Sequence, residues 1–219
     1  MFPTTGDIIL APFEDAGLYE EQKGRAAFWS DNSFMGIDLT PLHEQSMKEV
    51  FAMPVVGYFH PSILLSTDRA SKVFDFRTCS VEDLKNFAMP FNFTISRAGV
   101  VHGIAGWFDC DFMGTQNVVP LKTGPEAPGT HWYQCRLLFS SPLGVNAGQR
   151  VSGTVTFAAN DSFSYDVVMV ACVEGTSGPE VKTEQTVYLQ DQHYHYLYDQ
   201  NAAVDGEGGG HVKGNSGQI

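Results

Sequence analysis

The segment FAMPFNFTI, residues 87–95, decides the fold class of this chain. Its apolar side chains begin with Phe87 and fall on every second residue up to Ile95, with small or polar residues between them. This alternation is typical of a β-strand with one buried face. Pro90 cannot donate a backbone hydrogen bond, so the strand is predicted at the edge of a sheet or at a bulge.

Similar segments continue on both sides of this one, and Asn160–Ser162 is a hairpin turn signal between two of them. The predicted strands lie at 7–13, 73–79, 87–95, 101–112, 132–139, 151–159, 164–173 and 185–198. Many strands at short spacing indicate a barrel or a sandwich. We expect a mainly β fold, an antiparallel β-barrel over residues 1–198, followed by a disordered Gly-rich tail at 199–219.

A two-helix segment is inserted between the strands near the N-terminus, at about residues 15–53. The first helix is predicted from Asp15 to Trp29. The second begins where Thr40 can cap it and Pro41 suits the first helical position, and it stops before Pro54. Both helices carry an apolar stripe that something has to cover. From the composition alone, a helical cap over one end of the barrel is the expected arrangement.

The composition argues against several classes of function. The chain has 25 acidic and 13 basic residues, a net charge of −12, which makes nucleic acid and anionic membranes poor partners and favours a basic peptide. No apolar run is long enough to span a membrane, and the N-terminus lacks the pattern of a signal peptide. The four cysteines lie far apart, which indicates free thiols in a reducing compartment and no zinc site.

The motif Thr130–Tyr133, with the sequence THWY, lies between a Pro/Gly-rich loop at 123–129 and a predicted strand. Binding groups usually project from such loops. His131 titrates near neutrality, and Trp132 offers a flat aromatic face to a cation. Taken alone, the motif is explained more simply by a capping threonine beside two packing residues.

Short motifs occur in a fixed order along the chain. They are MFPT (1–4), LAPF (10–13), FW (28–29), SF (33–34), GIDL (36–39), PVV (54–56), VHG (101–103), WFD (107–109), THWYQ (130–134), FSSPL (139–143), SGT (152–154) and SYD (164–166). Together they resemble the C-terminal region of protein arginine methyltransferases, and most of all the coactivator-associated type I enzymes. The resemblance extends from residue 1 to about residue 198.

The resemblance implies that the chain is the β-barrel and dimerisation-arm portion of such an enzyme. The family's other portion is a Rossmann-like domain that binds S-adenosylmethionine, and this sequence shows neither its Gly-rich turn nor its pair of substrate-gripping glutamates. The segment GIAG at 103–106 lies inside a strand pattern, where glycines indicate close packing. We therefore expect this chain to bind no cofactor and to have no activity alone.

The resemblance also implies that the two helices form an arm that docks on the cofactor domain of a second subunit. Some apolar residues of the arm must instead pack its two helices together. The candidates for the dimer contact are Leu18, Phe28, Trp29, Phe34, Met35, Leu42, Met47 and Phe51.

In the family, the loop that contains Thr130, His131 and Trp132 lines the slot for the substrate arginine. His131 is expected to orient the substrate or to accept a proton. The resemblance places three further aromatic residues near the bound peptide, although an amphipathic strand explains the last two equally well. These residues are Tyr133, Tyr194 and Tyr196. The interleaved His193 and His195 depart from the family pattern, so the peptide preference stays open.

The expected function is the substrate-binding and dimerisation portion of a type I protein (histone) arginine N-methyltransferase. Its substrates would be arginine-containing proteins such as histone tails, with S-adenosylmethionine bound by the parent enzyme, in the nucleus and cytoplasm. A freestanding, non-catalytic peptide-binding or scaffold β-barrel is the alternative. A methyltransferase domain encoded directly upstream of Met1 would distinguish the two.

Overall fold

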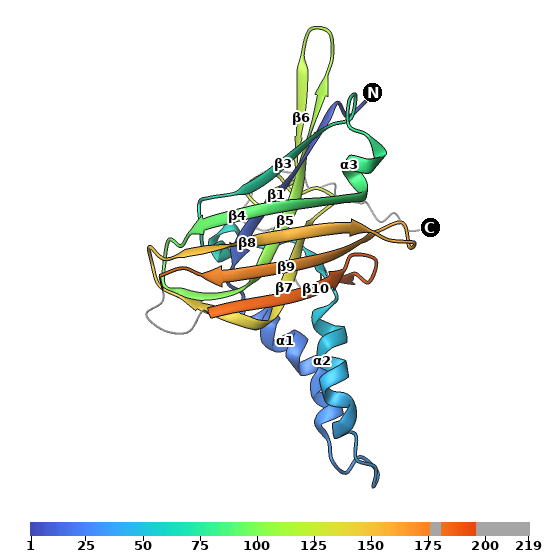
Figure 1. Cartoon of the computed structure of the whole chain (residues 1–219), viewed down its shortest axis with the longest axis vertical. Helices are drawn as coiled ribbons and strands as arrows, with labels where there is room; N and C mark the ends of the chain where they lie inside the picture. Colours follow the sequence, from blue (N-terminus) through green and yellow to red (C-terminus); the bar gives the residue numbers. More distant parts are fainter. Residues whose placement is uncertain (176–180, 196–219) are drawn as a thin grey trace, which may run out of the picture.

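The structure is a computed structural model, and it describes residues 1–175 and 181–195. Its strands form two sheets (Figure 1). The larger sheet contains β1 (Thr5–Phe13), β2 (Val55–Gly57), β3 (Ala70–Asp75), β5 (Gly99–Met113), β6 (Val118–Lys122), β7 (Gln134–Val145) and β11 (His193–Tyr194). The smaller sheet contains β4 (Asn86–Thr94), β8 (Arg150–Ala159), β9 (Tyr165–Val173) and β10 (Val181–Tyr188).

The two sheets together make the antiparallel barrel that the sequence predicts. The larger sheet has the order β11–β2–β7–β5–β1–β3, with β6 paired to β5, and the smaller has the order β10–β9–β8–β4. β10 lies beside β7 and β3 lies beside β4, so the sheets meet along both edges. The hydrogen-bonded ladder itself stays divided into two sheets. Apart from the parallel pair of β11 with β2, neighbouring strands are antiparallel.

Strand β4 confirms the reading of residues 87–95. Its side chains alternate between exposed and buried from Asn86 to Thr94. It lies at the edge of the smaller sheet, paired on one side only, to β8. An edge strand tolerates Pro90, because the missing donor would otherwise interrupt a second ladder. The inward-facing side chains, among them Phe91 and Phe93, join Leu10, Ile104 and others in the core between the sheets.

Several predicted boundaries are wrong. The strand expected at 132–139 begins at Gln134, because the preceding residues form a turn. The final strand, expected at 185–198, ends at Tyr188 and is followed by a turn and the two-residue β11. Residues 196–198 and the tail expected at 199–219 lie outside the described residues. Thr40 does not cap a helix, since its hydroxyl donates to Asp38 at 2.7 Å.

The inserted helices project from one end of the barrel, opposite the hairpin of β5 and β6 (Figure 1). They are α1 (Ala16–Ala26) with the 3-10 turn η1 (Ala27–Ser30), and α2 (His43–Phe51) preceded by the 3-10 turn η2 (Thr40–Leu42). The remaining short helices are η3 (Pro61–Ile63) and α3 (Val81–Lys85). Within the described residues, no helix is long and apolar enough to span a membrane.

A second core joins the base of this arm to the outer face of the larger sheet. Leu18 of α1 and Phe51 of α2 pack there with Phe13, Ala105 and Leu138. Phe51 is completely buried. Burying a side chain of this size contributes about 1.5–3 kcal/mol. The base of the arm is therefore packed on the barrel as part of the same fold.

A buried ion pair fixes the start of α1 on the barrel. One carboxylate oxygen of Asp15 accepts from the Leu18 amide at 2.9 Å and so caps the helix. The other accepts from Arg136 of β7 at 2.8 Å. Arg136 is only 3% exposed, and its guanidinium lies over the Phe59 ring. The Asp15 amide donates to Nδ1 of His102, whose pKa is lowered by burial.

We predict that Asp15→Ala lowers the free energy of unfolding by about 3–5 kcal/mol, because it leaves the Arg136 charge buried without its carboxylate. Asp15→Asn should cost less, since its amide oxygen can still cap α1. Thermal or urea unfolding measures both. Glu82→Ala is the control. Its partner Lys85 is exposed, so this substitution should lower the free energy of unfolding by less than about 1 kcal/mol. Equal stability of wild type and Asp15→Ala would contradict the prediction.

Candidate functional site

The Thr130–Tyr133 segment is a tight turn at the start of β7. The Tyr133 amide donates to the Thr130 carbonyl at 3.3 Å, and the Trp132 amide to the Thr130 hydroxyl at 3.4 Å. Tyr133 has a φ of +53°, in the left-handed region that non-glycine residues rarely occupy. Such a conformation costs of the order of 1 kcal/mol and persists only where the surroundings hold it. The turn therefore needs support from outside itself.

Tyr58 supplies that support and was missed by the sequence reading. Its hydroxyl donates to the Thr130 carbonyl at 2.6 Å, and its ring packs on Tyr133 with centroids 4.6 Å apart. A Cβ added to Gly129 would lie 2.9 Å from the Tyr58 hydroxyl, so glycine permits this approach. Burial raises the pKa of Tyr58, and the neighbouring Tyr133 phenol adds to the rise. Nothing local in the sequence links Tyr58 to a turn 72 residues away.

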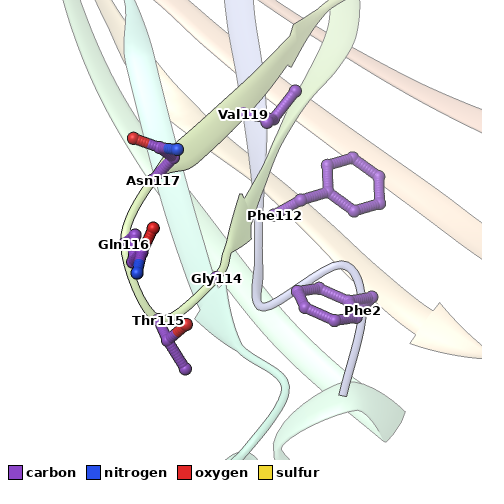
Figure 2. A pocket seen from close by; sticks show the side chains of 7 residues that line it. All are labelled: Phe2, Phe112, Gly114, Thr115, Gln116, Asn117 and Val119. Atoms are coloured by element: carbon purple, nitrogen blue, oxygen red, sulfur yellow. The ribbon is translucent and has the colours of Figure 1, made fainter.

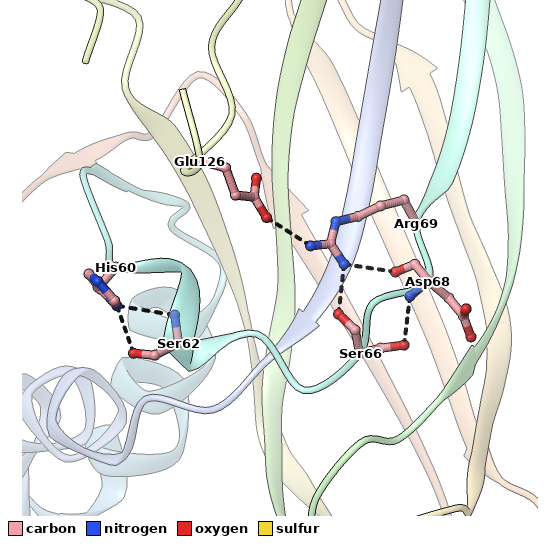
Figure 3. Close-up of polar contacts among 6 residues, drawn as sticks. All are labelled: His60, Ser62, Ser66, Asp68, Arg69 and Glu126. Carbon is pink, nitrogen blue, oxygen red and sulfur yellow. Dashed lines mark hydrogen bonds and ion pairs between the residues drawn. The ribbon is translucent and has the colours of Figure 1, made fainter. Parts of the chain in front are cut away.

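Two further contacts hold the Pro/Gly-rich loop that leads into the turn. Arg69 pairs with Glu126 of this loop at 3.0 Å, as Figure 3 shows, and its guanidinium lies over the Trp107 ring. The same guanidinium donates to the backbone carbonyls of Ser66 and Asp68 at 2.7 and 3.1 Å. At the start of the loop, the side-chain nitrogen Nε2 of Gln134 donates to the Thr123 carbonyl at 2.8 Å.

The turn borders a cavity of about 450 Å³ at one mouth of the barrel. His131, Trp132 and Tyr133 line one side, and Tyr194 and Gln192 come from the C-terminal segment. The inner wall is apolar and is made by Ile8, Leu10, Leu137, Phe157 and Leu189. Trp132 is 58% exposed and meets Phe108 edge-on at 5.9 Å between centroids. The structure thus brings together four of the six candidate substrate residues.

The other two candidate substrate residues are Thr130 and Tyr196. Thr130 does not line the cavity, and it shapes the turn through its carbonyl and hydroxyl oxygens. Tyr196 lies outside the described residues. Within the described residues, no side chain pairs with the exposed imidazole of His131. Tyr194 is positioned by the pairing of β11 with β2 and donates to Gln192 at 2.7 Å.

His193 and His195 tie β11 to its surroundings. His195 bonds Glu21 of α1 at 2.9 Å. Burial lowers the pKa of His193, with smaller lowering effects from the positive charge of Arg25 and from His195. The two histidines on either side of Tyr194 therefore lie close to α1 of the arm.

The candidate arm residues separate into two groups. Leu18 and Phe51 are buried in the core at the base of the arm, and Met47 packs against it. Phe28, Trp29 and Phe34 form an edge-to-face cluster toward the tip, with centroids 5.1 and 5.2 Å apart. Phe28, Phe34, Met35, Leu42 and also Ile37 are exposed, Met35 at 89% and Ile37 at 62%. The apolar surface that a partner could cover is therefore at the tip.

A different cavity of about 460 Å³ lies beside the tip of the β5–β6 hairpin (Figure 2). Phe2 stacks on Phe112 there with centroids 6.3 Å apart, and Val119 and the 114–117 turn complete the lining. None of its described lining residues has a titratable side chain, so they offer no general acid or base.

The segment GIAG at 103–106 is part of a strand. The glycines at 103 and 106 lie inside β5, and a Cβ on Gly103 would meet the Leu137 carbonyl oxygen at 1.9 Å. Glycine serves there for strand packing, as expected, and forms no turn at the start of a helix. Among the described residues, no group of three His, Cys, Asp or Glu side chains is arranged to hold a metal ion.

We predict that Tyr58→Phe lowers the free energy of unfolding by about 1 kcal/mol, or the melting temperature by about 2–4 °C. The ring contact with Tyr133 is kept, so the loss reports the hydrogen bond to Thr130. Tyr194→Phe removes a hydrogen bond at an exposed position and serves as the control. Scanning calorimetry measures both, and equal melting temperatures for the two variants would refute the supporting role of Tyr58.

Comparison with known proteins agrees with this architecture. Residues 4–170 match the family described as the arginine methyltransferase oligomerization subdomain. The chain is 41% identical over 196 residues to the histone-arginine methyltransferase CARMER of Drosophila ananassae, and 40% identical to the probable enzyme of that name of Drosophila melanogaster. Each alignment covers 90% of this chain and 36% of the relative. The chain thus spans about a third of the length of these relatives.

Solved structures share the fold. Arabidopsis thaliana protein arginine methyltransferase 10 has a TM-score of 0.74 at 21% identity, over 86% of this chain and 60% of that one. The Trypanosoma brucei PRMT1 enzyme–prozyme heterotetrameric complex with AdoHcy has a TM-score of 0.69 at 26% identity, over 86% and 57%. The family match covers most of the described residues, and the fold agrees with it. The chain belongs to the arginine methyltransferase oligomerization subdomain family.

Proposed function

We propose that this chain is the substrate-binding and dimerisation portion of a type I protein arginine N-methyltransferase that acts on histones. The observation that carries the proposal is the Thr130–Tyr133 turn, held at the mouth of the barrel opposite Tyr194 in a chain of this family. The similarity to histone-arginine methyltransferases supports the substrate class. Histone substrates favour the nucleus, and four free cysteines also fit a reducing cytoplasm.

The lining of the cavity limits what this chain contributes to the reaction. Among the described residues, no Asp, Glu, Lys or Arg lines it. A guanidinium needs acceptors for its fork of donors, so its carboxylate partners must come from outside the described residues. Trp132 offers an aromatic face to the cation, and His131 orients it or accepts the proton released when a guanidinium nitrogen is methylated. The methyl donor, S-adenosylmethionine in this family, is held by another domain of the parent enzyme.

The arm supplies the second function. Its tip exposes an apolar surface made by Phe28, Phe34, Met35, Ile37 and Leu42. Exposed patches of this kind mark protein–protein contacts. We infer that the tip docks on the cofactor domain of a second subunit in the parent enzyme. The 219-residue chain alone is then a monomer or a weak, concentration-dependent dimer, since the docking surface belongs to the other domain.

We predict that His131→Ala in the parent enzyme lowers turnover of a histone peptide by about 10²–10³-fold, as the loss of one positioned polar group does in a dry site. Affinity for S-adenosylmethionine should stay within about twofold, and the melting temperature should barely change, because the imidazole is exposed. Steady-state kinetics and calorimetric titration measure these effects. Wild-type turnover in a folded variant would reduce the Thr130–Tyr133 segment to a structural turn.

We predict that Ile37→Asp weakens dimerisation of the parent enzyme by at least about tenfold, because it places a charge on the apolar tip. Val73→Asp on β3 is a matched control, since Val73 is also 62% exposed but lies on the barrel. Sedimentation equilibrium measures the dissociation constant. Equal effects of the two substitutions would exclude the arm tip from the dimer contact.

A further inference from the structure

We propose that the cavity at the mouth of the barrel takes a large apolar side chain of the bound polypeptide, close in sequence to the target arginine. The inference rests on the proposed function and adds a substrate requirement to it. The arginine itself stays at the rim, beside His131 and Trp132. The apolar side chain enters the barrel between Ile8, Leu137 and Phe157.

The chemistry of the cavity wall favours an apolar occupant. Its inner part is lined by aliphatic and aromatic side chains and by the Cys135 thiol. Burial raises the pKa of Cys135 to about 12, so this thiol stays neutral. Three polar groups, His131, Gln192 and the Tyr194 hydroxyl, belong to the turn and to the C-terminal segment at the rim. Gln134, the first residue of β7, is buried, and its side-chain nitrogen donates to the Thr123 carbonyl. This arrangement of an apolar interior with few polar groups is usual for ligand sites.

The apolar space continues further into the barrel end. A second cavity of about 320 Å³ shares Ile8, Phe108, Phe157 and Leu189 with the first. Apart from Asp7, which accepts a hydrogen bond from Ser71, its lining carries no charged side chain. A side chain that entered past Trp132 would therefore meet apolar surface along its whole length.

A guanidinium is a poor occupant of this space. Burying a cation without a counter-charge and enough acceptors is strongly unfavourable, and the described lining provides no counter-charge and one buried side-chain acceptor without a partner, Oε1 of Gln134. The rim continues directly into the surface proposed for the substrate, because Trp132 and Tyr133 line both. The net charge of −12 attracts a basic polypeptide to this surface. An arginine with an apolar neighbour satisfies the rim and the interior at once.

The chain carries built-in reporters for a test. Trp107 and Trp132 line the cavity, whereas Trp29 lies in the arm. The ¹⁵N-labelled 219-residue chain would be titrated by NMR to millimolar concentrations of a capped peptide with one arginine flanked by three glycines on each side. Six further peptides each replace one glycine by leucine. The seventh comparison peptide keeps the best leucine and replaces the arginine by glutamine.

We expect at least one leucine peptide to shift the indole signals of Trp107 and Trp132 and to bind at least about tenfold more tightly than the all-glycine peptide. The signal of Trp29 should not move. Filling the cavity by Cys135→Leu or, independently, by Leu189→Phe should remove this advantage, provided that melting shows a folded variant. Val118→Leu, on the exposed strand β6, is the control, and this variant should still bind the leucine peptide more tightly than the all-glycine peptide.

Equal binding of all the leucine peptides and the all-glycine peptide would overturn the inference, as would an advantage that survives in both filled variants. These outcomes differ from failure of the proposed function. If the glutamine peptide binds as tightly as its arginine counterpart, the apolar site stands and arginine recognition by the rim fails. Whether the parent enzyme transfers methyl groups is tested separately, by measuring its turnover of a histone peptide.

Discussion

Burial on both faces of three neighbouring strands is the constraint on which this structure depends. In β1, β5 and β7, consecutive residues point to opposite sides and both are buried, as in Leu10 and Ala11 or Leu137 and Leu138. One member of each pair packs inside the barrel and the other packs under the arm. The barrel, the base of the arm and the mouth of the cavity therefore share one backbone layer, and a shift of register in β7 would disturb all three.

The predictability of each element from sequence follows from how it is buried. β4 has one solvent-exposed face, so its alternation is visible in the residues 87–95 and was read correctly. The start of β7 is obscured because Trp132 and Tyr133 suit a strand by composition and yet lie in a turn. Thr40 has the right type for a cap, but Asp38 competes for its hydroxyl. The hairpin strand β6 was not predicted, and its side chains are largely exposed.

The candidate site, too, was predictable from the sequence only in part. The Thr130–Tyr133 motif was singled out as a candidate site through the family resemblance, although Trp132 and Tyr133 were expected in a strand, and the structure brings His131, Trp132, Tyr133 and Tyr194 to one cavity. The groups that hold it come from elsewhere: Tyr58 lies beyond β2, and Arg69 lies just before β3. Contacts of such long sequence separation leave no local pattern, since neither partner determines the conformation of the other's neighbours. The motif itself is therefore easier to find in the sequence than the residues that support it.

The position of β11 has a consequence for the order in which the protein forms during synthesis. Within the described residues, Tyr194 is at the end of the chain, and its strand pairs with β2 and is bonded to α1 through His195 and Glu21. Both β2 and Glu21 lie in the first 60 residues, so these pairings are among the most non-local contacts of the fold. The other strands and the arm precede β11 in the chain and leave the ribosome before it. Among the described walls of the cavity, the one that contains Tyr194 is therefore added after the others, once translation has passed this segment.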